Sequence, residues 1–525
     1  MRTFLTPPDP SAFKPQDVEI DSKALNRAVK RIRKAIGDRE SIVVYADYDA
    51  DGITAGAIIW ETLYQLGAKV MPYIPHRIEE GYGLSVKGLD TVKREFNPSL
   101  IITVDHGITA KEKIDYAKKI GMEVIVTDHH VKPKVLPPGL VIHTTKLSGA
   151  GVAWFVAKEL SGAHQDELLA LAAIGTIADM MPLVGPNRAI VKSGLQALNK
   201  TKRVGIEALV ADAGLTGGAL DTYAVSHILA PRLNAMGRLE HALDALRLLC
   251  TKRTDKAREL AQKLGLKNRE RQKLTADTTA HAMKDLALQA PGMTFQKKLI
   301  FVVHESYNPG VIGLVAGKLV EEYWRPAIVV AKGKIYSKAS ARSINGFNIV
   351  EAIRTCSDIL VDVGGHPLAA GFTVETKHLG ELEDRLKKLA EKELVAEKLT
   401  RVLRIDMEIP LVAVSLKLWQ KLQELAPFGF GNPEPVFASR EVKVLETRLV
   451  GANGKHLKLR IVSSDNITMK QYNNLPLDAI AFNLGELCRK CQPDQLIDIA
   501  YTIEIDTWSG LERLQLKIRD IHARD

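Results

Sequence analysis

The sequence predicts a multidomain α/β protein, with a parallel-sheet domain, a long helical connector, a second α/β domain and a C-terminal β-barrel. Short apolar, β-branched segments at 41–46, 100–104 and 123–127 alternate with helix-like segments, which is the order that builds a parallel sheet. A long polar helical run at 239–288 predicts the connector, after which strand-like and helix-like segments alternate again. Beyond residue 401 the segments become short and alternate in polarity, as in a β-barrel.

Length and composition fit several globular domains. At 525 residues the chain is too long for one hydrophobic core. Apolar residues make up 46% and charged residues 26% of the chain, which are ordinary values for a globular protein. No apolar run approaches the roughly 18 residues that a membrane span needs. The net charge of +10 weakly favours a polyanionic partner.

The N-terminal segment and the cysteines indicate the compartment. The first residues, MRTFLTPPDPSAFKP, are rich in Pro and lack a hydrophobic signal core, so we expect an extended arm on a cytoplasmic protein. Four cysteines in a chain of this length do not form a disulfide framework. Cys488 and Cys491 form one CxxC without a second pair, and such a lone CxxC is more often a structural accident than a zinc site.

The most informative stretch is SIVVYADYDADG, where a buried strand ends in three carboxylates. Asp47, Asp49 and Asp51 lie two residues apart, directly before a turn at Gly52. Carboxylates this close repel one another, and beside a core they need a compensating positive charge. A hard metal cation with oxygen ligands supplies it most simply.

This stretch has three other interpretations. A calcium EF-hand fails because its twelfth position here is Ile58 instead of Glu, and because a strand precedes the loop. A solvated acidic turn is the less favoured interpretation, since the acids directly follow a buried strand. An aspartate-nucleophile phosphatase, whose D-x-D also follows a strand, stays open on these residues alone.

Two further predicted strands also end in acidic and imidazole side chains. Asp105 and His106 follow the strand at 100–104, and Asp128, His129 and His130 follow the next one. An isolated Asp after a strand is often only a helix N-cap, and a His pair is often structural. The carboxyl ends of parallel strands, however, meet along one crevice, so we expect these clusters to form one metal site.

Asp179 extends this cluster. It lies near the end of a strongly apolar helix predicted at 165–181, among Ile, Ala, Met and Leu. A carboxylate in such surroundings is costly to bury unless it is paired or ligating, although it could also be exposed at the last turn. We expect it to be a metal ligand.

Several motifs resemble those of a known family, the DHH phosphoesterases. DYDADG, VDHG, TDHH and IGTIADMMPL match its four catalytic motifs in order and spacing. APRLNAMGR is similar to a motif of the RecJ branch, SARS and GGHPLAAGF to the DHHA1 domain, and LAPFGFGNPEP to the start of the OB-type domain of bacterial RecJ. One difference is HESYNPG, where the family often has WHPG.

Oxygen-rich ligands without a thiolate suit Mn²⁺ or Mg²⁺ better than Zn²⁺, and this many acids indicates two ions. The resemblance implies the individual roles. Asp49 and Asp51 would bind separate ions, Asp105 would bridge them, His129 and Asp179 would complete the ligands of the second ion, and Asp47 would complete or adjoin those of the first. Asp105 and His130 would be catalytic, with His130 at the scissile phosphate. Asp128 would orient a neighbouring His, and His106 is as well explained by a structural role as by a phosphate contact.

The resemblance also implies a substrate site in two parts. Arginine offers a forked phosphate donor, and glycines let backbone N–H groups approach an anion. The expected substrate-binding residues are Arg232, Asn234, Arg238, Ser340, Arg342, Gly364, Gly365 and His366. The OB-like barrel would extend the track for a single strand.

The resemblance therefore implies a metal-dependent exonuclease that digests single-stranded DNA 5′-to-3′ into mononucleotides in recombination and repair. Alternatives are a phosphodiesterase for short oligoribonucleotides or cyclic dinucleotides, and a non-catalytic DNA-binding relative. We expect a monomer, with a single-stranded-DNA-binding protein and a helicase as candidate partners and no membrane association. The expected parts are an N-terminal arm and helix (1–40), the DHH domain (41–235), the connector (236–290), the DHHA1 domain (291–398) and the OB-like domain (399–525).

Overall fold

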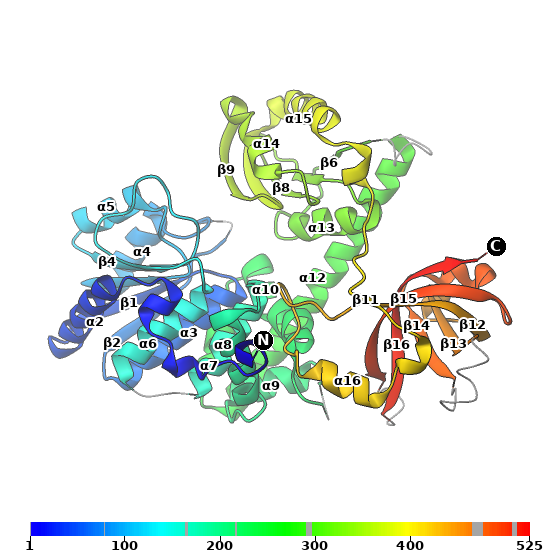
Figure 1. Cartoon of the computed structure of the whole chain (residues 1–525). Helices are drawn as coiled ribbons and strands as arrows, with labels where there is room; N and C mark the ends of the chain where they lie inside the picture. The colour runs from blue at the N-terminus through cyan, green and yellow to red at the C-terminus, as the bar shows by residue number, and fades with distance from the viewer. Residues whose placement is uncertain are drawn as a thin grey trace. The chain divides into compact units, whose positions relative to one another are not determined.

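The computed structural model describes residues 2–77, 79–162, 166–215, 218–289, 297–464, 476–506 and 512–524 (Figure 1). The chain divides into two compact units. One comprises Lys14–Asp179 and Gln196–Val402, and the other comprises Met1–Phe13, Met180–Leu195 and Leu403–Asp525. Every residue of the predicted metal site belongs to the first of these units.

A five-stranded parallel sheet carries the acidic motifs. Its order is β2-β1-β3-β4-β5, and β1 pairs with β2 on one side and β3 on the other. The inner strands are β-branched and buried on both faces, as expected for a sheet covered by helices. The bounds are β1 Ser41–Ala46, β2 Lys69–Tyr73, β3 Leu100–Val104, β4 Glu123–Asp128 and β5 Leu140–His143.

Helices cover this sheet and complete the lobe. Asp21 caps α2 by accepting hydrogen bonds from the N–H groups of Lys23 and Ala24. α3 and α6 pack against each other, and each also packs against α7 and the sheet. Both helices are therefore apolar on almost every side. The bounds are α2 Ser22–Gly37, α3 Ala50–Gln65, α4 Val86–Phe96, α5 Lys111–Lys119, α6 Gly149–Ser161 and α7 Asp166–Ala178.

A helical connector leads from this lobe to the second one. Its main element is α12 (Thr254–Gln289), a helix of 36 residues that packs against α9, α10 and α13. The helical elements that precede α12 are α9 Val204–Asp212, the π-helical turn Ala224–Leu229, α10 Ala230–Leu239 and α11 Leu243–Cys250.

The second lobe is built on a mixed five-stranded sheet of order β6-β7-β8-β10-β9. The parallel pair β6–β7 is followed by antiparallel pairs, and β9 forms one edge. Arg342 lies beside Ala369 in the register, and Ala369 lies beside His366, so Arg342 and His366 share one face. The bounds are β6 Ile300–His304, β7 Ala327–Ala331, β8 Tyr336–Arg342, β9 Leu360–His366, β10 Ala369–Glu375, α13 Ile312–Tyr323, α14 Ile349–Arg354 and α15 Leu379–Glu393.

The other unit contains a closed β-barrel. Its strands pair in the order β12-β13-β14-β16-β15, and an antiparallel pairing of β12 with β15 closes the ring around an apolar core. In the same unit, the buried Arg188 guanidinium donates hydrogen bonds to the backbone carbonyls of Phe4, Leu425, Ala426 and Pro427. The bounds are α1 Arg2–Leu5, α8 Gly185–Leu198, β11 Met407–Glu408, α16 Leu416–Gln423, β12 Phe437–Val450, β13 His456–Ser463, β14 Leu477–Ala481, β15 Leu496–Asp506 and β16 Arg513–Ala523.

The predicted fold class is confirmed: a parallel-sheet domain, a helical connector, a second α/β domain and a C-terminal barrel are all present. Within the described ranges, no helix combines the length and the apolar character that a bilayer crossing requires.

Candidate metal and phosphate site

The site begins where β1 passes into α3. Asp49 is the N-cap of α3 and accepts a hydrogen bond from the N–H of Gly52, while Asp51 lies in the first turn. Asp51 also faces the start of α6, where the N–H groups of Gly149 and Ala150 donate to its two oxygens at 2.6 and 2.9 Å. A helix N-terminus is a favourable place for a carboxylate, so α6 fixes the orientation of Asp51.

Acids and imidazoles from four segments converge here. His129 Nε2 lies 3.1 Å from Asp105 Oδ1, 3.7 Å from Asp179 Oδ2 and 3.9 Å from Asp51 Oδ2. Three groups of side chains each place one possible ligand atom per residue within 4.8 Å of one another. These groups are Asp47 with Asp49 and Asp105; Asp51 with His129 and Asp179; and Asp105 with His129 and His130.

The crowding of these acids changes their protonation. Burial, and then the charge of Asp49, raise the pKa of Asp51 to about 7. Burial, and then the charges of Asp51 and Asp49, raise the pKa of Asp179 to about 8. The pKa values of Asp47 and Asp105 are raised well above the usual range for the same two reasons. The cluster therefore cannot ionise fully by itself, which is the behaviour expected of ligands that share cations.

The donor set fits divalent metal ions. Asp105 Oδ1 is buried and accepts no hydrogen bond from the described residues, even though His129 lies close to it. Burial lowers the pKa of His129 to about 4, so its imidazole is in the neutral form that ligates metals. Carboxylate oxygens dominate the set, which suits Mn²⁺ or Mg²⁺.

Three glycines allow the acids to pack this closely. A Cβ at Gly149 would lie 2.4 Å from Asp105 Oδ1, and one at Gly175 would lie 2.4 Å from Asp51 Oδ1. A Cβ at Gly52 would lie 2.6 Å from that of Asp47. All three distances are shorter than real contacts, so a side chain at any of these positions would displace a predicted ligand.

Replacing Gly149 with Ala should therefore weaken Mn²⁺ binding about tenfold, because groups that support metal ligands typically affect affinity on this scale. Isothermal titration with Mn²⁺ measures the effect. The matched control is Gly37→Ala, since a Cβ at Gly37 on α2 meets no atom within 4 Å. Equal Mn²⁺ affinity in the two variants would contradict the role assigned to Gly149.

The histidines after β3 and β4 have different environments. His130 Nδ1 is hydrogen-bonded to Asp128 Oδ1 at 2.8 Å. Although burial acts to lower it, the pKa of His130 is raised to about 9 by the hydrogen bond and charge of Asp128. His106 is buried, and its Nε2 donates to the carbonyl of Tyr45. Burial lowers the pKa of His106 to about 4, so a structural role accounts for it.

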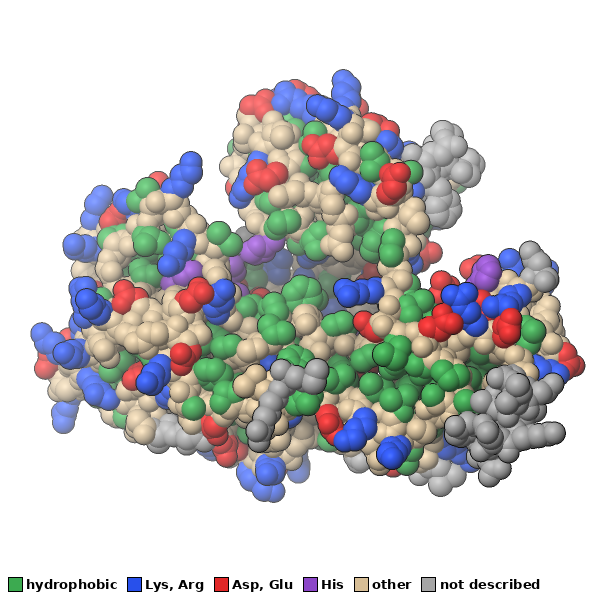
Figure 2. Space-filling model, in the orientation of Figure 1, with side chains coloured by type: hydrophobic (Ala, Val, Ile, Leu, Met, Phe, Trp, Pro, Cys, Tyr) green, Lys and Arg blue, Asp and Glu red, His purple; other side chains and the backbone are tan. Residues whose placement is uncertain are grey.

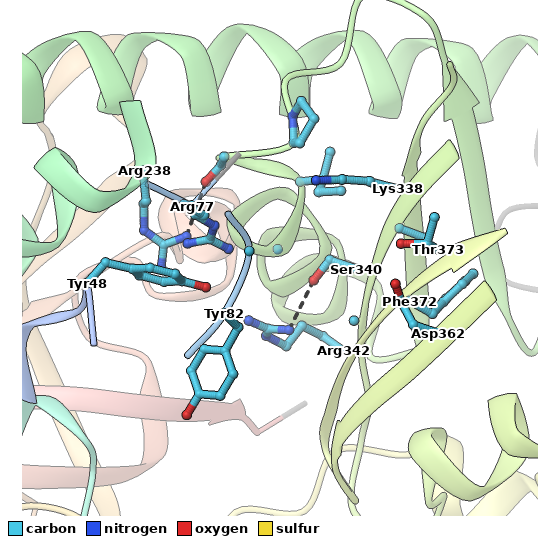
Figure 3. Close-up of a pocket in the computed structure, with 17 residues that line it drawn as sticks. Tyr48, Arg77, Tyr82, Arg238, Lys338, Ser340, Arg342, Asp362, Phe372 and Thr373 are labelled. Carbon is cyan, nitrogen blue, oxygen red and sulfur yellow. Dashed lines mark hydrogen bonds between the residues drawn. The ribbon is translucent and has the colours of Figure 1, made fainter. Parts of the chain in front are cut away.

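Beside the acidic cluster lies a polar cavity of about 290 Å³ that both lobes line. Figure 3 shows Arg77 and Arg238 on one side of it and Ser340, Arg342 and Lys338 on the other. In the space-filling view, histidines are visible at the hollow between the lobes that carry the two sheets (Figure 2).

Three arginines and Lys338 outweigh the one carboxylate, Asp362, in the lining of the cavity. Gly313, in the first turn of α13, lines it, and a Cβ there would lie 2.9 Å from Ser340 Oγ and 3.3 Å from Arg342 Nη2. The start of α13 therefore packs closely against Ser340 and Arg342. Burial, and then the charges of other arginines, lower the pKa of Arg238 to about 10. Among the residues the structure describes, Arg77, Arg238 and Arg342 form no ion pair with a carboxylate.

The predicted substrate residues divide into two sets. Arg238, Ser340 and Arg342 line the cavity, and the ring of His366 lies 6.3 Å from that of His130. In contrast, Arg232 lies near Asp212 and donates to the carbonyl of Ile228, and Asn234 Oδ1 accepts a hydrogen bond from the N–H of Ala50.

Arg232 and Asn234 thus make contacts within the protein, and their contact with substrate stays a prediction. Gly364 and Gly365 lie on the edge strand β9 outside the cavity wall, with Gly365 at φ +145°. Arg77 and Tyr82 line the cavity although the motifs do not single them out. Their signal in the sequence is the polar, glycine-containing loop HRIEEGYG directly after β2.

Comparison with known proteins places these elements in one family. Three family models match: the DHH family, N-terminal domain (41–176), the DHHA1 domain (296–394) and the RecJ OB domain (405–520). The single-stranded-DNA-specific exonuclease RecJ of Bacillus subtilis (strain 168) is 38% identical over 99% of this chain, which spans 65% of that protein's length. The Salmonella typhimurium protein of the same name is 31% identical, over 95% of this chain and 90% of its own length.

A solved structure shows the same architecture. The crystal structure of RecJ in complex with Mn²⁺ from Thermus thermophilus has a TM-score of 0.84 and 32% identity, and the match covers 100% of this chain and 74% of that one. From its three matched domains and these relatives, this chain belongs to the RecJ family.

Proposed function

We propose that this chain is a metal-dependent exonuclease that hydrolyses single-stranded DNA from its 5′ end and releases mononucleotides. The observation that carries the proposal is the adjacency of a buried carboxylate and histidine cluster to a cavity whose arginines form no ion pair among the described residues. The names of the relatives, single-stranded-DNA-specific exonucleases, and the Mn²⁺ in the Thermus structure support it.

Two ions, Mn²⁺ or Mg²⁺, would be held by the predicted ligands. Asp47 and Asp49 would bind one ion, Asp51, His129 and Asp179 would bind the other, and Asp105 would contact both. When bound, such ions polarise the phosphoryl group and lower the pKa of the attacking water.

The chain's own residues position the substrate. The cavity lined by Arg77, Arg238 and Arg342, the arginine cavity, would hold the phosphate at the strand's 5′ end. The next phosphate would then reach the acidic cluster. His130, fixed by Asp128, would lie at that scissile phosphate. A cavity that binds a terminal phosphate would favour digestion from that end. The 5′-to-3′ direction itself is what the resemblance to the family implies.

The remaining expectations also belong to this proposal. The site between the two lobes would take one flexible strand, and the barrel would bind single strands, as OB folds do. The domain limits given from the sequence, a monomeric state and partners such as a single-stranded-DNA-binding protein and a helicase remain proposals, as does a cytoplasmic location.

The test is Mn²⁺-dependent digestion of end-labelled single strands that are blocked at one terminus or the other. We expect digestion to stop when the 5′ end is blocked and to continue when the 3′ end is blocked. A duplex of the same sequence is the control and should resist digestion. Digestion that stops only with a 3′ block would contradict the direction, and no digestion of any single strand would contradict the function.

One alternative uses the same chemistry on smaller substrates. A phosphodiesterase for short oligoribonucleotides or cyclic dinucleotides would act fastest on the shortest members of a length series. The presence of a barrel beyond the two lobes favours longer strands. We therefore expect activity to rise with the length of the DNA until the barrel's site is filled.

A further inference from the structure

The loop after β2 brings a tyrosine to the catalytic histidine. The Tyr82 hydroxyl lies 3.3 Å from His130 Nε2, and it donates to the backbone carbonyl of Asp105 at 3.4 Å. The rings of Tyr82 and His130 meet edge to face, with centroids 6.0 Å apart. None of the sequence motifs of the metal site includes this tyrosine.

The loop is built to hold Tyr82 in this place. Gly81 and Gly83 flank it with φ values of +85° and +66°, a conformation that other residues rarely adopt. The buried Tyr45 hydroxyl donates to the carbonyl of Gly83. One residue before Gly81, the Glu80 carboxylate accepts hydrogen bonds from the Tyr73 hydroxyl and from the N–H of His76. Strands β1 and β2 thus anchor the loop on both sides of the tyrosine.

With Tyr82 in place, both ring nitrogens of His130 have partners. Nδ1 faces Asp128 and Nε2 faces the tyrosine hydroxyl. Asp128 is itself fixed, because it accepts hydrogen bonds from the N–H groups of Ile108, His129 and His130. Two fixed partners determine the orientation of an imidazole ring more tightly than one does.

We propose that Tyr82 is a positioning residue for His130, completing a Tyr82–His130–Asp128 chain beside the metal site. The inference rests on the proposed nuclease function. Tyr82 also lines the arginine cavity, where Figure 3 shows it below Arg342. Tyr82 is thus part of the lining of the cavity, while its hydroxyl lies at the histidine.

Removing only the hydroxyl separates these two contributions. Tyr82→Phe keeps the ring and should lower kcat about tenfold, since one hydrogen bond that orients a catalytic group is lost. KM should stay within about twofold, because the cavity wall is retained. Mn²⁺ affinity, measured by titration calorimetry, should not change. The matched control is Tyr116→Phe, which removes a tyrosine hydroxyl bonded to Asp90 on the outside of the lobe.

A double-mutant cycle tests whether Tyr82 acts through His130. If it does, adding Tyr82→Phe to a His130→Gln variant should not lower kcat any further. Unchanged kcat in Tyr82→Phe, or losses that multiply in the double variant, would overturn the proposal.

An NMR readout keeps the inference separate from the nuclease assignment. The ring signals of His130 in the full-length protein should shift in Tyr82→Phe and not in Tyr116→Phe. A wild-type protein that digests no single strand would refute the proposed function, while an unshifted His130 signal would refute the role of Tyr82.

Discussion

Replacing Asp105 with Ala is expected to lower the rate of single-strand digestion by roughly three orders of magnitude or more. Asp105 is the one carboxylate that belongs to two of the three ligand groups, and the loss of metal ligation removes several kcal/mol of transition-state stabilisation. Single-turnover digestion of a labelled strand in Mn²⁺ measures the effect. The variant should still bind DNA, because the arginine cavity is intact.

In the absence of metal, the same substitution should stabilise the folded protein. Without metal, burial and then the charges of neighbouring acids raise the pKa of Asp105, so its removal relieves the cost of burial and the repulsion. The free energy of unfolding in the presence of a chelator should therefore increase in Asp105→Ala. The control is Asp115→Ala, an acid on α5 that lies near Lys111 at the surface. Full activity in Asp105→Ala would refute the metal-dependent mechanism.

The metal cluster is predictable from the sequence because of a property of parallel sheets. β1, β3 and β4 are adjacent and parallel, so their carboxyl ends coincide whatever the length of the intervening chain. Acids placed directly after these strands must then meet. Asp179 is expected there for a different reason, since a carboxylate at the end of an apolar helix is costly to bury without a partner.

The supporting residues could not be predicted in the same way. The contact of Gly149 with Asp105 depends on how α6 packs against the sheet, which no local pattern encodes. The sequence SGAG at 148–151 gives a partial indication, because the Ser148 side chain caps a helix whose first turn consists of small residues. Likewise, the motif containing Arg232 and Arg238 does not reveal that the first arginine faces Asp212 and the second faces the cavity.

A substitution in the arginine cavity should have the second large effect. Replacing Arg342 with Gln should lower kcat/KM on a strand with a 5′ phosphate by up to roughly a hundredfold, because a charge-assisted hydrogen bond to phosphate contributes about 1.5–3 kcal/mol. The loss should be much smaller on a strand with a 5′ hydroxyl, which offers no terminal phosphate to bind. Parallel assays of the two strands measure this difference.

Comparing the two kinds of 5′ end also tests what sets the direction of digestion. Arg354→Gln is the matched control, since Arg354 is also an arginine of the second lobe but lies near Glu351 on the surface. If Arg342→Gln weakens digestion of both strands equally, the cavity is a general DNA contact and the direction must come from elsewhere. If the loss of kcat/KM is confined to the strand with the 5′ phosphate, the cavity binds that phosphate. The position of the cavity beside the acidic cluster then determines which bond is cut first.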